Sequence, residues 1–573
     1  MSDSAIPSQP KTSTQHEQTR LALFSGRRGL KRREALLAYL FLSPAIIIIG
    51  LFGLFPLVFS AYQSTRAGLN NVVGRPDGLG QYIRAIDNLA YVLAFWLAIF
   101  FVVVAVRQIN ELLATSRAKE ENPWRWLLPG MLIAIGLGLM LWFVFVFMPG
   151  LLEIGEQLVG LTAAERNEAF PQFLREAWLA PGVASTFYYA LVALILSGAA
   201  YFYLQRNTPA TIRDSFYTGK LATTVFMVLA AIAISWFTFS EIQLAYAEAL
   251  EEGESLAIWA QMVTISAGFV LLLLSWLVWR TAAHRDSNLQ TGLRFLAGIL
   301  LMIGGWVLIS ELPTVIAEGD SDWWIGLRTT IFYVVGALPA ELFLGLVLAT
   351  LLFQDIKAKG LLRMVYFLPY ITPAVGAAAV FKVLFSGNPN GTINTVLTSI
   401  GLQPLGWLNE PNGINQLIGE ALNLNMPDWA AGPSLALVVA IIFGIWKYTG
   451  YNVVFFLAGL GNISREYYEA ASMDGAGRWA QFRHITLPLL SPITYFLTIF
   501  GVIGAFKAFN TIFVLRSRAA LGTMDTASLV IFDAFNRDTR IGYAAALGII
   551  LLLVILSATA VLDRLAKGRV FYG

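Results

Sequence analysis

Three charged residues interrupt apolar segments that are long enough to span a bilayer. Glu341, Lys447 and Lys507 each stand inside a run that is otherwise hydrophobic. Placing a charge at the centre of a bilayer costs about 2.5–3.5 kcal/mol, so such residues normally face a partner or a water-filled cavity. Two interpretations stay open. Glu341 and a lysine could form an ion pair that fixes helix packing, or these side chains could contact a polar substrate directly.

Aromatic and polar side chains surround one of these lysines. Trp446, Tyr448, Tyr451 and Asn452 lie within one short stretch around Lys447. Lys447 and Tyr451 are one helical turn apart, so both can face one cavity. Aromatic rings can stack on the apolar face of a ligand, while hydroxyl and amide groups supply hydrogen bonds. The alternative is that these aromatic residues only fill the interior or lie at the membrane interface.

A second pattern occupies a polar segment between two apolar runs. Glu469-Ala470-Ala471 is followed by Gly475, and Ile485-Thr486-Leu487-Pro488 closes the pattern. Ser464 is a suitable N-cap for a helix that starts the segment. Gly475 permits a turn that residues with a Cβ resist. The spacing predicts a helix–turn–helix whose Glu469 could make a charge-assisted contact with a partner protein. The alternative is an ordinary turn with a solvated, charged face.

The chain lacks the motifs of an enzyme. It contains no cysteine and only three histidines, His16, His284 and His484, which lie far apart in the sequence. No G-x-x-x-x-G-K-[ST], G-x-S-x-G or H-E-x-x-H run occurs. We therefore expect no catalytic residue, no metal site, no bound cofactor and no ATP hydrolysis by the chain itself. A net charge of +3 is too small to indicate nucleic acid as a partner.

Membrane-spanning helices must position these residues. The 573 residues are 57% hydrophobic and 13% charged, whereas soluble domains carry roughly 25% charged residues. Because lipid cannot hydrogen-bond a bare backbone, apolar runs of about 20 residues predict helices. The sequence therefore predicts an all-α, polytopic transmembrane helical bundle of about 12 spans. The predicted spans are 36–62, 88–106, 126–149, 184–204, 221–240, 259–279, 295–315, 326–354, 362–386, 434–459, 490–514 and 541–562.

The loop charges predict the orientation of the spans. Basic residues recur in alternate loops, including 117–125, 357–363 and 465–483, while the intervening loops are acidic or mixed. Cytoplasmic loops carry an excess of lysine and arginine. We therefore expect a multi-pass protein of the cell (inner or cytoplasmic) membrane, with both termini in the cytoplasm. Residues 1–34 are expected to form a disordered cytoplasmic N-terminus.

The spacing from Glu469 to Pro488 resembles the EAA loop of the membrane-spanning subunits of binding-protein-dependent ABC importers. The resemblance is closest to the larger permease subunit of maltose-type sugar transporters, and it covers roughly 30–87 and 320–573. Further similar stretches are 40–45, 339–342, 345–349, 366–369, 456–460 and 473–476.

The resemblance implies a type I ABC importer permease core with about six extra helices. Residues 35–87 would be the first core transmembrane helix and its outer loop. Residues 88–319 would be an inserted block of about six transmembrane helices, serving as a lipid-facing scaffold or docking an extra partner. Residues 320–573 would be the conserved permease core, with the EAA loop at 460–488.

The resemblance also implies roles for individual residues. A separate ATPase would grip the EAA loop through Glu469, Ala470, Ala471, Asp474, Gly475, Ile485, Leu487 and Pro488. Substrate contacts would come from the helix before this loop and the helix after it, at Gly444, Lys447, Tyr448, Tyr451, Asn510 and Thr511. Of the positions before the loop, Tyr451 alone matches the family in residue type.

The function that the resemblance implies is that of a transmembrane permease subunit of an ATP-driven ABC importer. It would translocate a sugar, an oligosaccharide or an α-glucoside such as maltose, maltodextrin or trehalose, into the cytoplasm. Its partners would be an ABC ATPase dimer that uses ATP and Mg, a second permease subunit, an extracytoplasmic solute-binding protein and membrane lipid. The main alternative is a secondary active carrier of the twelve-span type. Such carriers usually have two related halves, whereas the halves of this chain differ.

Overall fold

The computed structural model describes residues 27–68, 74–207, 214–253, 256–282, 287–568 and 570. The chain forms two compact units, Met1–Tyr62 and Gln63–Gly573. The expected disorder of residues 1–26 lies outside the described residues. Helix α1 already begins at Arg27, within the stretch expected to be disordered.

The first unit contains one apolar span. It consists of α1 (Arg27–Ile49), a π-helical turn (Gly50–Leu54) and most of α2 (Phe55–Gln63). Pro56 has no amide hydrogen to donate, and Phe55 donates to the carbonyl of Gly50 in the wider π pattern. The helical hydrogen bonding therefore continues past a proline, and Leu37–Gln63 form one span of 27 residues.

The second unit is almost entirely helical, with one small antiparallel pair of strands, β1 (Arg66–Ala67) and β2 (Arg75–Pro76). Its first helices are α3 (Gly80–Ile86), α4 (Leu89–Ala118), α5 (Leu127–Gln157), α6 (Ala163–Leu179), α7 (Val183–Asn207), α8 (Asp214–Glu252), α9 (Ile258–Ala282) and α10 (Ser287–Glu318). These are followed by α11 (Ser321–Phe353), α12 (Lys359–Ile371), α13 (Ala374–Leu384), α14 (Thr392–Ser399), α15 (Ile414–Ala421) and α16 (Leu435–Gly461). The last are α17 (Arg465–Met473), α18 (Arg478–Gln481), α19 (Leu487–Leu489), α20 (Ser491–Phe506), α21 (Asn510–Leu515), α22 (Ala527–Asn536) and α23 (Ile541–Ala566).

The predicted all-α membrane fold is confirmed. Among the described residues, ten helices are long and apolar enough to cross a membrane, and the number is up to twelve if each of two bent helix pairs is one span. The bent pairs are α12 with α13, at 91°, and the α18–α19 segment with α20, at 58°. The first bend interrupts the span predicted at 362–386, whereas the second bend lies at the start of the span predicted at 490–514.

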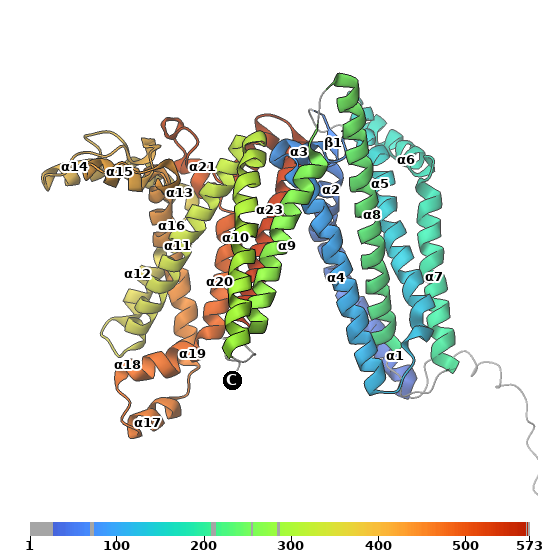
Figure 1. The fold of residues 1–573 in the computed structure, drawn as a ribbon, viewed down its shortest axis with the longest axis horizontal. Helices are drawn as coiled ribbons and strands as arrows, with labels where there is room; N and C mark the ends of the chain where they lie inside the picture. Colours follow the sequence, from blue (N-terminus) through green and yellow to red (C-terminus); the bar gives the residue numbers. More distant parts are fainter. Residues whose placement is uncertain are drawn as a thin grey trace, which may run out of the picture. The chain divides into compact units, whose positions relative to one another are not determined.

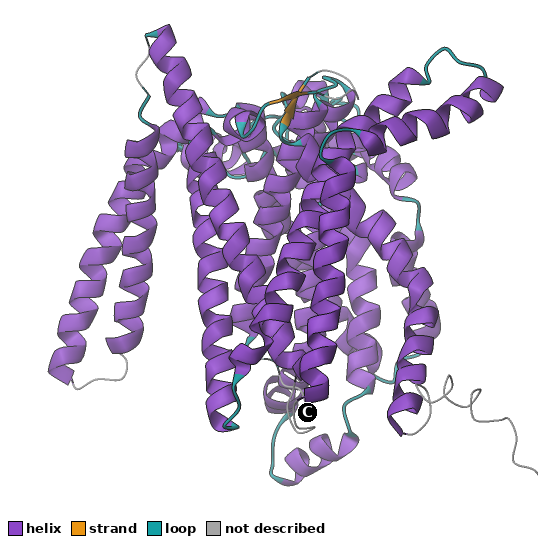
Figure 2. Ribbon diagram, turned by 90° about the vertical axis from the view of Figure 1, so that its right-hand side faces the viewer, coloured by secondary structure: helices purple, strands orange, loops and turns teal. Residues whose placement is uncertain are grey.

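Helices α4 to α10 form the block between β2 and α11. In it, α4 packs on α8, α5 packs on α7 and α8, and α9 and α10 form a helical hairpin (Figure 1). Figure 2 shows that helices make up nearly all of the described chain. Small residues allow close approach: a Cβ at Gly304 of α10 would come within 2.9 Å of the Cβ of Leu271 on α9. Such contacts suit helices in lipid, where packing rather than the hydrophobic effect drives association.

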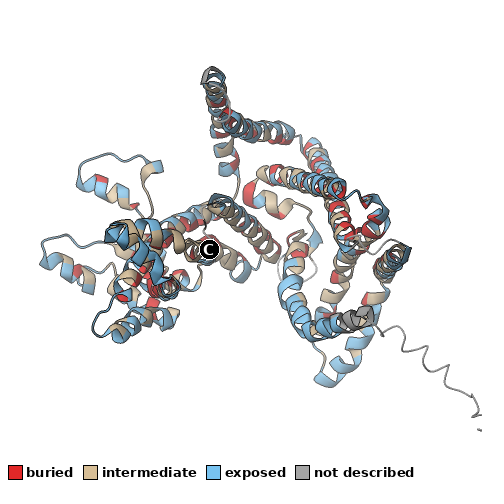
Figure 3. Ribbon diagram, turned by 90° about the horizontal axis from the view of Figure 1, so that it is seen from below, coloured by how far each residue is buried: buried red, intermediate tan, exposed pale blue. Residues whose placement is uncertain are grey.

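The remaining helices pack around α11 and α16. Helix α11 contacts α16, α20 and α22, while α12 packs on α16 and α13 on α21. Buried residues gather between these helices, and their outer faces are exposed (Figure 3). Helices α14 and α15 lie at one end of this group, and α17 and α18 lie at the opposite end, on the same side as the C-terminus (Figure 1).

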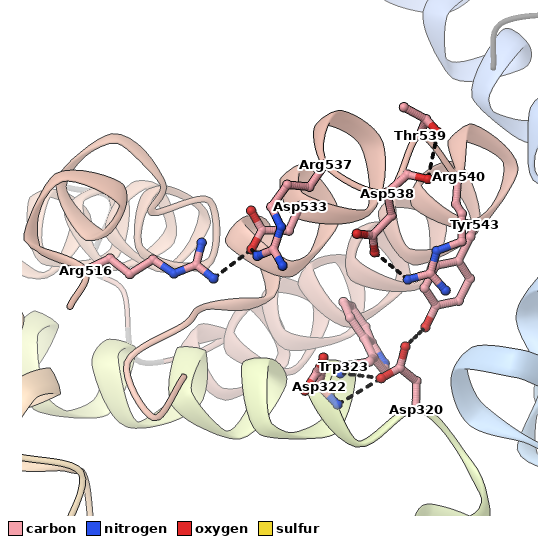
Figure 4. A network of polar contacts seen from close by, with 10 residues as sticks. All are labelled: Asp320, Asp322, Trp323, Arg516, Asp533, Arg537, Asp538, Thr539, Arg540 and Tyr543. Carbon is pink, nitrogen blue, oxygen red and sulfur yellow. Dashed lines mark hydrogen bonds and ion pairs between the residues drawn. The ribbon is translucent and has the colours of Figure 1, made fainter. Parts of the chain in front are cut away.

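Polar contacts join α11 to α23, and Arg516 to α22, in the region that Figure 4 shows. Asp320 caps α11 by accepting a hydrogen bond from the amide of Asp322, at 2.9 Å, and its other oxygen accepts one from the hydroxyl of Tyr543. Arg516 forms ion pairs with Asp525 and Asp533 at 2.9 and 2.7 Å. Burial raises the pKa of Asp525 to about 6, despite the opposing effect of Arg516.

Helix α23 is also joined to α20, through Asp563, which lies 20 residues after Tyr543 on α23. The hydroxyl of Tyr495 on α20 donates to a carboxylate oxygen of Asp563 on α23 at 2.8 Å. Helix α23 therefore has polar connections both to the start of α11 and to α20.

Candidate functional site

A cavity of about 330 Å³ is lined by residues of α11, α12, α16, α20 and α21 and of the segments next to them. Ligand pockets commonly measure about 300–1,000 Å³. Side chains that can stack or donate hydroxyl hydrogen bonds are those of Tyr333, Tyr370, Tyr448 and Tyr451. The other polar and charged side chains of the lining are Glu341, Asn452, Lys507, Asn510 and Thr511. The cavity is therefore suited to a polar ligand with an apolar face.

The structure brings several of the predicted substrate residues together. Tyr448 and Tyr451 on α16 and Asn510 and Thr511 on α21 all line this cavity, although they come from helices on either side of the α17–α18 segment. Two other predicted contacts, Gly444 and Lys447, are not among the lining residues.

Tyrosine rings form one wall of the cavity. The ring of Tyr370 lies 4.9 Å from that of Tyr451 and 6.3 Å from that of Tyr448, measured between centroids. Tyr370 stands at the end of α12, just before the 91° bend into α13. The bend places this ring against α16. The sequence-based prediction missed Tyr370; Pro369 and Pro373 on either side of the bend were the available signal.

Lys447 supports this bend rather than the cavity. Its side chain is buried, and its Nζ donates to the carbonyls of Pro369, Tyr370 and Thr372 at 3.4, 3.4 and 2.8 Å. In a continuous helix, the carbonyl of Pro369 would accept from residue 373, which is a proline and has no amide hydrogen. Lys447 thus supplies a donor that the backbone lacks. Its contact with substrate stays a prediction, since the structure shows only these contacts within the protein.

Glu341 does not form the predicted ion pair. Its side chain is only 8% exposed. No ion pair joins it to Lys447, to Lys507 or to any other basic residue of the described chain. Lys447 is engaged with the backbone carbonyls, which is the physical reason that the pair does not form. Gly444 faces Glu341 instead: a Cβ at position 444 would lie 3.3 Å from its Oε1.

The break between α20 and α21 completes the cavity. Helix α20 ends at Phe506 and α21 begins at Asn510, so Lys507 and Phe509 lie in non-helical chain that lines the space. Gly501 allows α20 to approach α11, since a Cβ there would come within 2.3 Å of Leu338. Gly504, in contrast, has open space beside it. Helix α20 therefore packs closely on α11 at Gly501 and leaves free volume at Gly504.

The predicted helix–turn–helix is present in α17 and α18. Ser464 caps α17 by accepting a hydrogen bond from the amide of Glu466 at 3.3 Å. Gly475 has a φ of +78°, in the left-handed region that favours glycine. The side chain of Gln481 donates to the hydroxyl of Ser472 at 2.9 Å and to the carbonyl of Ala476 at 3.0 Å. These bonds fix the angle between the two short helices.

The predicted coupling residues lie on the surface of this segment. Glu469, Ala470, Asp474, Gly475 and Leu487 are exposed. The others, Ala471, Ile485 and Pro488, are half-buried.

Large side chains on the same segment are strongly exposed. Met473 is 89% exposed and Trp479 is 71% exposed, and Tyr467 is also exposed. Tyr468 is half-buried, and its hydroxyl hydrogen-bonds that of Thr486 at 2.9 Å. Tyr467 and Trp479 are therefore the aromatic residues that project from this segment. Exposed apolar side chains of this kind mark interaction surfaces.

A multi-pass helical bundle with a polar cavity inside and an exposed helical hairpin at one end has the architecture of a membrane permease. The family model for the binding-protein-dependent transport system inner membrane component matches residues 341–570. The lactose transport system permease protein LacF of Rhizobium radiobacter is 31% identical over 242 residues, which are 41% of this chain and 73% of that protein. The chain therefore belongs to this family of inner membrane transport components.

Other relatives have the same character. The arabinooligosaccharides transport system permease protein AraP of Bacillus subtilis is 28% identical over 42% of this chain and 70% of its own length. The trehalose/maltose transport system permease protein MalF of Thermococcus litoralis is 27% identical over 43% of this chain and 76% of its own length. The crystal structure of a bacterial alginate ABC transporter in complex with an alginate pentasaccharide-bound periplasmic protein includes a similar chain. That chain is 22% identical over 43% of this one and 79% of itself, with a TM-score of 0.37.

The family match contains the α17–α18 segment and most of the cavity lining, whereas Tyr333 and Leu338 of the lining precede it. It begins at Glu341 and includes α16, the α17–α18 segment and α20 to α23. The block of helices α4 to α10 precedes the matched residues.

Proposed function

We propose that this chain is the permease subunit of an ATP-driven sugar importer and that an oligosaccharide or α-glucoside passes through the cavity into the cytoplasm. The observation that carries the proposal is the composition of the cavity lining. Tyr370, Tyr448 and Tyr451 offer rings to the apolar face of a sugar, and Asn510 and Thr511 offer hydrogen bonds to its hydroxyl groups. Relatives named for lactose, arabinooligosaccharides and trehalose or maltose support this substrate class.

The α17–α18 segment couples this chain to an ATPase in the proposal. A separate ABC ATPase dimer binds and hydrolyses ATP with Mg, and this chain provides only the docking surface. Met473 and Trp479 are apolar side chains that a cleft on the ATPase can cover. Glu469 supplies a charge-assisted contact beside them. The segment leads through α19 directly into α20, a wall of the cavity.

Alternating access follows from this connection. Movement of the α17–α18 segment during ATP hydrolysis shifts α20 relative to α11 and opens the cavity first to one side and then to the other. The ATPase acts by shifting the populations of two conformations. A second permease subunit completes the translocation path, and an extracytoplasmic solute-binding protein delivers the sugar at the side of α14 and α15. Both termini face the cytoplasm in this arrangement.

Substitution of Tyr451 tests the proposed site. In proteoliposomes that contain the assembled transporter, Tyr451→Ala should lower ATP-dependent sugar uptake about tenfold, because it removes a ring contact and a hydroxyl hydrogen bond that contribute about 0.5–1.5 kcal/mol each. Tyr451→Phe keeps the ring and should retain more of the uptake. Basal ATP hydrolysis serves as the control for assembly and should not change. Unchanged uptake in Tyr451→Ala would show that the sugar passes elsewhere.

A further inference from the structure

Glu341 is a buried acidic residue with no partner in the protein. It lies in α11, lines the cavity and is 8% exposed. In the part of the chain that the structure describes, its carboxyl group makes no hydrogen bond and no ion pair. Buried polar groups normally have partners, and an ionisable residue within a membrane usually serves function. The missing partner must therefore come from the contents of the cavity.

The neighbouring helix leaves room for such a partner. Position 444 on α16 is a glycine, and a Cβ there would come within 3.3 Å of the Glu341 Oε1 and 2.7 Å of the Tyr333 hydroxyl. Even an alanine would crowd both groups. The backbone of α16 thus approaches the carboxyl without covering it by a side chain, and Tyr333 and Tyr448 border the same space.

Neither nearby lysine neutralises this carboxyl. Lys447 donates to three backbone carbonyls at the bend between α12 and α13. Lys507 lines the cavity but is exposed and forms no ion pair with Glu341. Water screens an exposed charge far more than a buried one. Neither lysine is therefore placed to offset a charge on Glu341 through a direct ion pair.

We propose that Glu341 determines the charge class of the transported sugar. Its carboxylate accepts hydrogen bonds from sugar hydroxyl groups, which are donors, and it repels sugars that carry carboxylate groups. The cavity then selects neutral sugars over uronates. This inference rests on the proposed function, because it requires a sugar to occupy the cavity.

Direct binding to the assembled, detergent-solubilised transporter tests the inference without the solute-binding protein, whose own selectivity would mask that of the cavity. The neutral probes are lactose, maltose, trehalose and arabinobiose, and the acidic probe is digalacturonate. Affinity is obtained from the rise in melting temperature with probe concentration. We expect the wild type to prefer at least one neutral probe over digalacturonate by more than about tenfold.

The Glu341→Gln variant should weaken binding of that neutral probe about tenfold, since a charge-assisted hydrogen bond becomes a neutral one. It should also strengthen binding of digalacturonate, so that the preference largely disappears. Glu420→Gln is the matched control, because this exposed glutamate of α15 lines no part of the cavity, and it should keep the preference of the wild type. Without probe, Glu341→Gln should melt at the same temperature as the wild type or higher, because no internal partner is lost.

Two results distinguish the inference from the proposed function. If Tyr451→Ala abolishes binding of the neutral probe while Glu341→Gln keeps the wild-type preference, the cavity binds sugar but Glu341 does not select it, and the inference is overturned. If neither variant changes the binding of any probe, the sugar does not occupy this cavity, and the proposed site fails as well.

Discussion

Replacing Lys447 by methionine should destabilise the protein, although methionine is more apolar and similar in length. The bond from Nζ to the carbonyl of Thr372 is 2.8 Å long, and a hydrogen bond from a charged donor contributes about 1.5–3 kcal/mol. The bonds to Pro369 and Tyr370, both 3.4 Å long, are weaker. Part of the loss is offset because a charge no longer has to be buried. We expect the free energy of unfolding to fall by about 2–4 kcal/mol.

The assay is thermal unfolding of the purified transporter. Lys447→Met should lower the melting temperature by about 5 °C or more, and Lys447→Arg, which keeps the charge, should lose less. Lys507→Met is the matched control. This exposed lysine forms no ion pair in the described chain, so its loss should change the melting temperature little. Uptake should fall together with stability in Lys447→Met, because Tyr370 at the bend lines the cavity.

Two outcomes would refute this account of Lys447. If Lys447→Met kept its melting temperature but lost uptake, the lysine would contact the sugar. If adding Glu341→Gln restored the stability of Lys447→Met, the two residues would form the ion pair that the structure lacks. We expect the two substitutions to be nearly additive in their effect on unfolding free energy.

Three further predictions concern coupling, pH and orientation. Glu469→Lys and Gly475→Pro should each reduce ATP-dependent uptake at least tenfold without loss of membrane insertion. Glu469→Lys acts by charge repulsion, and Gly475→Pro acts because proline cannot adopt a φ of +78°. Normal uptake in both variants would exclude the α17–α18 segment as the coupling site. Burial raises the pKa of Asp525 to about 6 in the folded protein, so ionisation of this carboxyl should lower stability as the pH rises from about 4 to 6. Over this pH range, the melting temperature of Asp525→Asn should fall less than that of the wild type. Equal falls in melting temperature would contradict the effect of burial. An impermeant thiol reagent applied to intact cells should label Glu252→Cys but not Lys357→Cys, and the reverse pattern would invert the proposed orientation.

The sequence was sufficient for features that depend on local chemistry. The spans follow from apolar length. The predicted ranges 184–204 and 259–279 agree closely with α7 and α9, whereas α4, α8 and α10 extend well beyond the predicted apolar runs. The turn at Gly475 was predicted because only local backbone conformation decides it. Ser464 caps α17 for the same reason.

Features that depend on distant segments were predicted less well. Whether Lys447 faces a carboxylate, a ligand or a carbonyl depends on where the α12–α13 bend lies in space. The sequence of α16 alone does not determine the position of that bend. Tyr370 and Tyr333 became cavity residues through packing of α12 and α11 on α16. The direction of Tyr468 toward Thr486 likewise depends on how the segment folds back onto its own end.

Helix α23 lines no part of the cavity, yet it connects two of the walls. Tyr543 joins it to the start of α11 through Asp320, and Asp563 joins it to α20 through Tyr495. Glu341 lies on α11 and Gly504 on α20. Helix α23 therefore connects both walls from outside the cavity, in addition to their direct contact at Gly501 and Leu338. Variants selected for an altered range of substrate sizes should include substitutions in α23, at positions that no sugar touches.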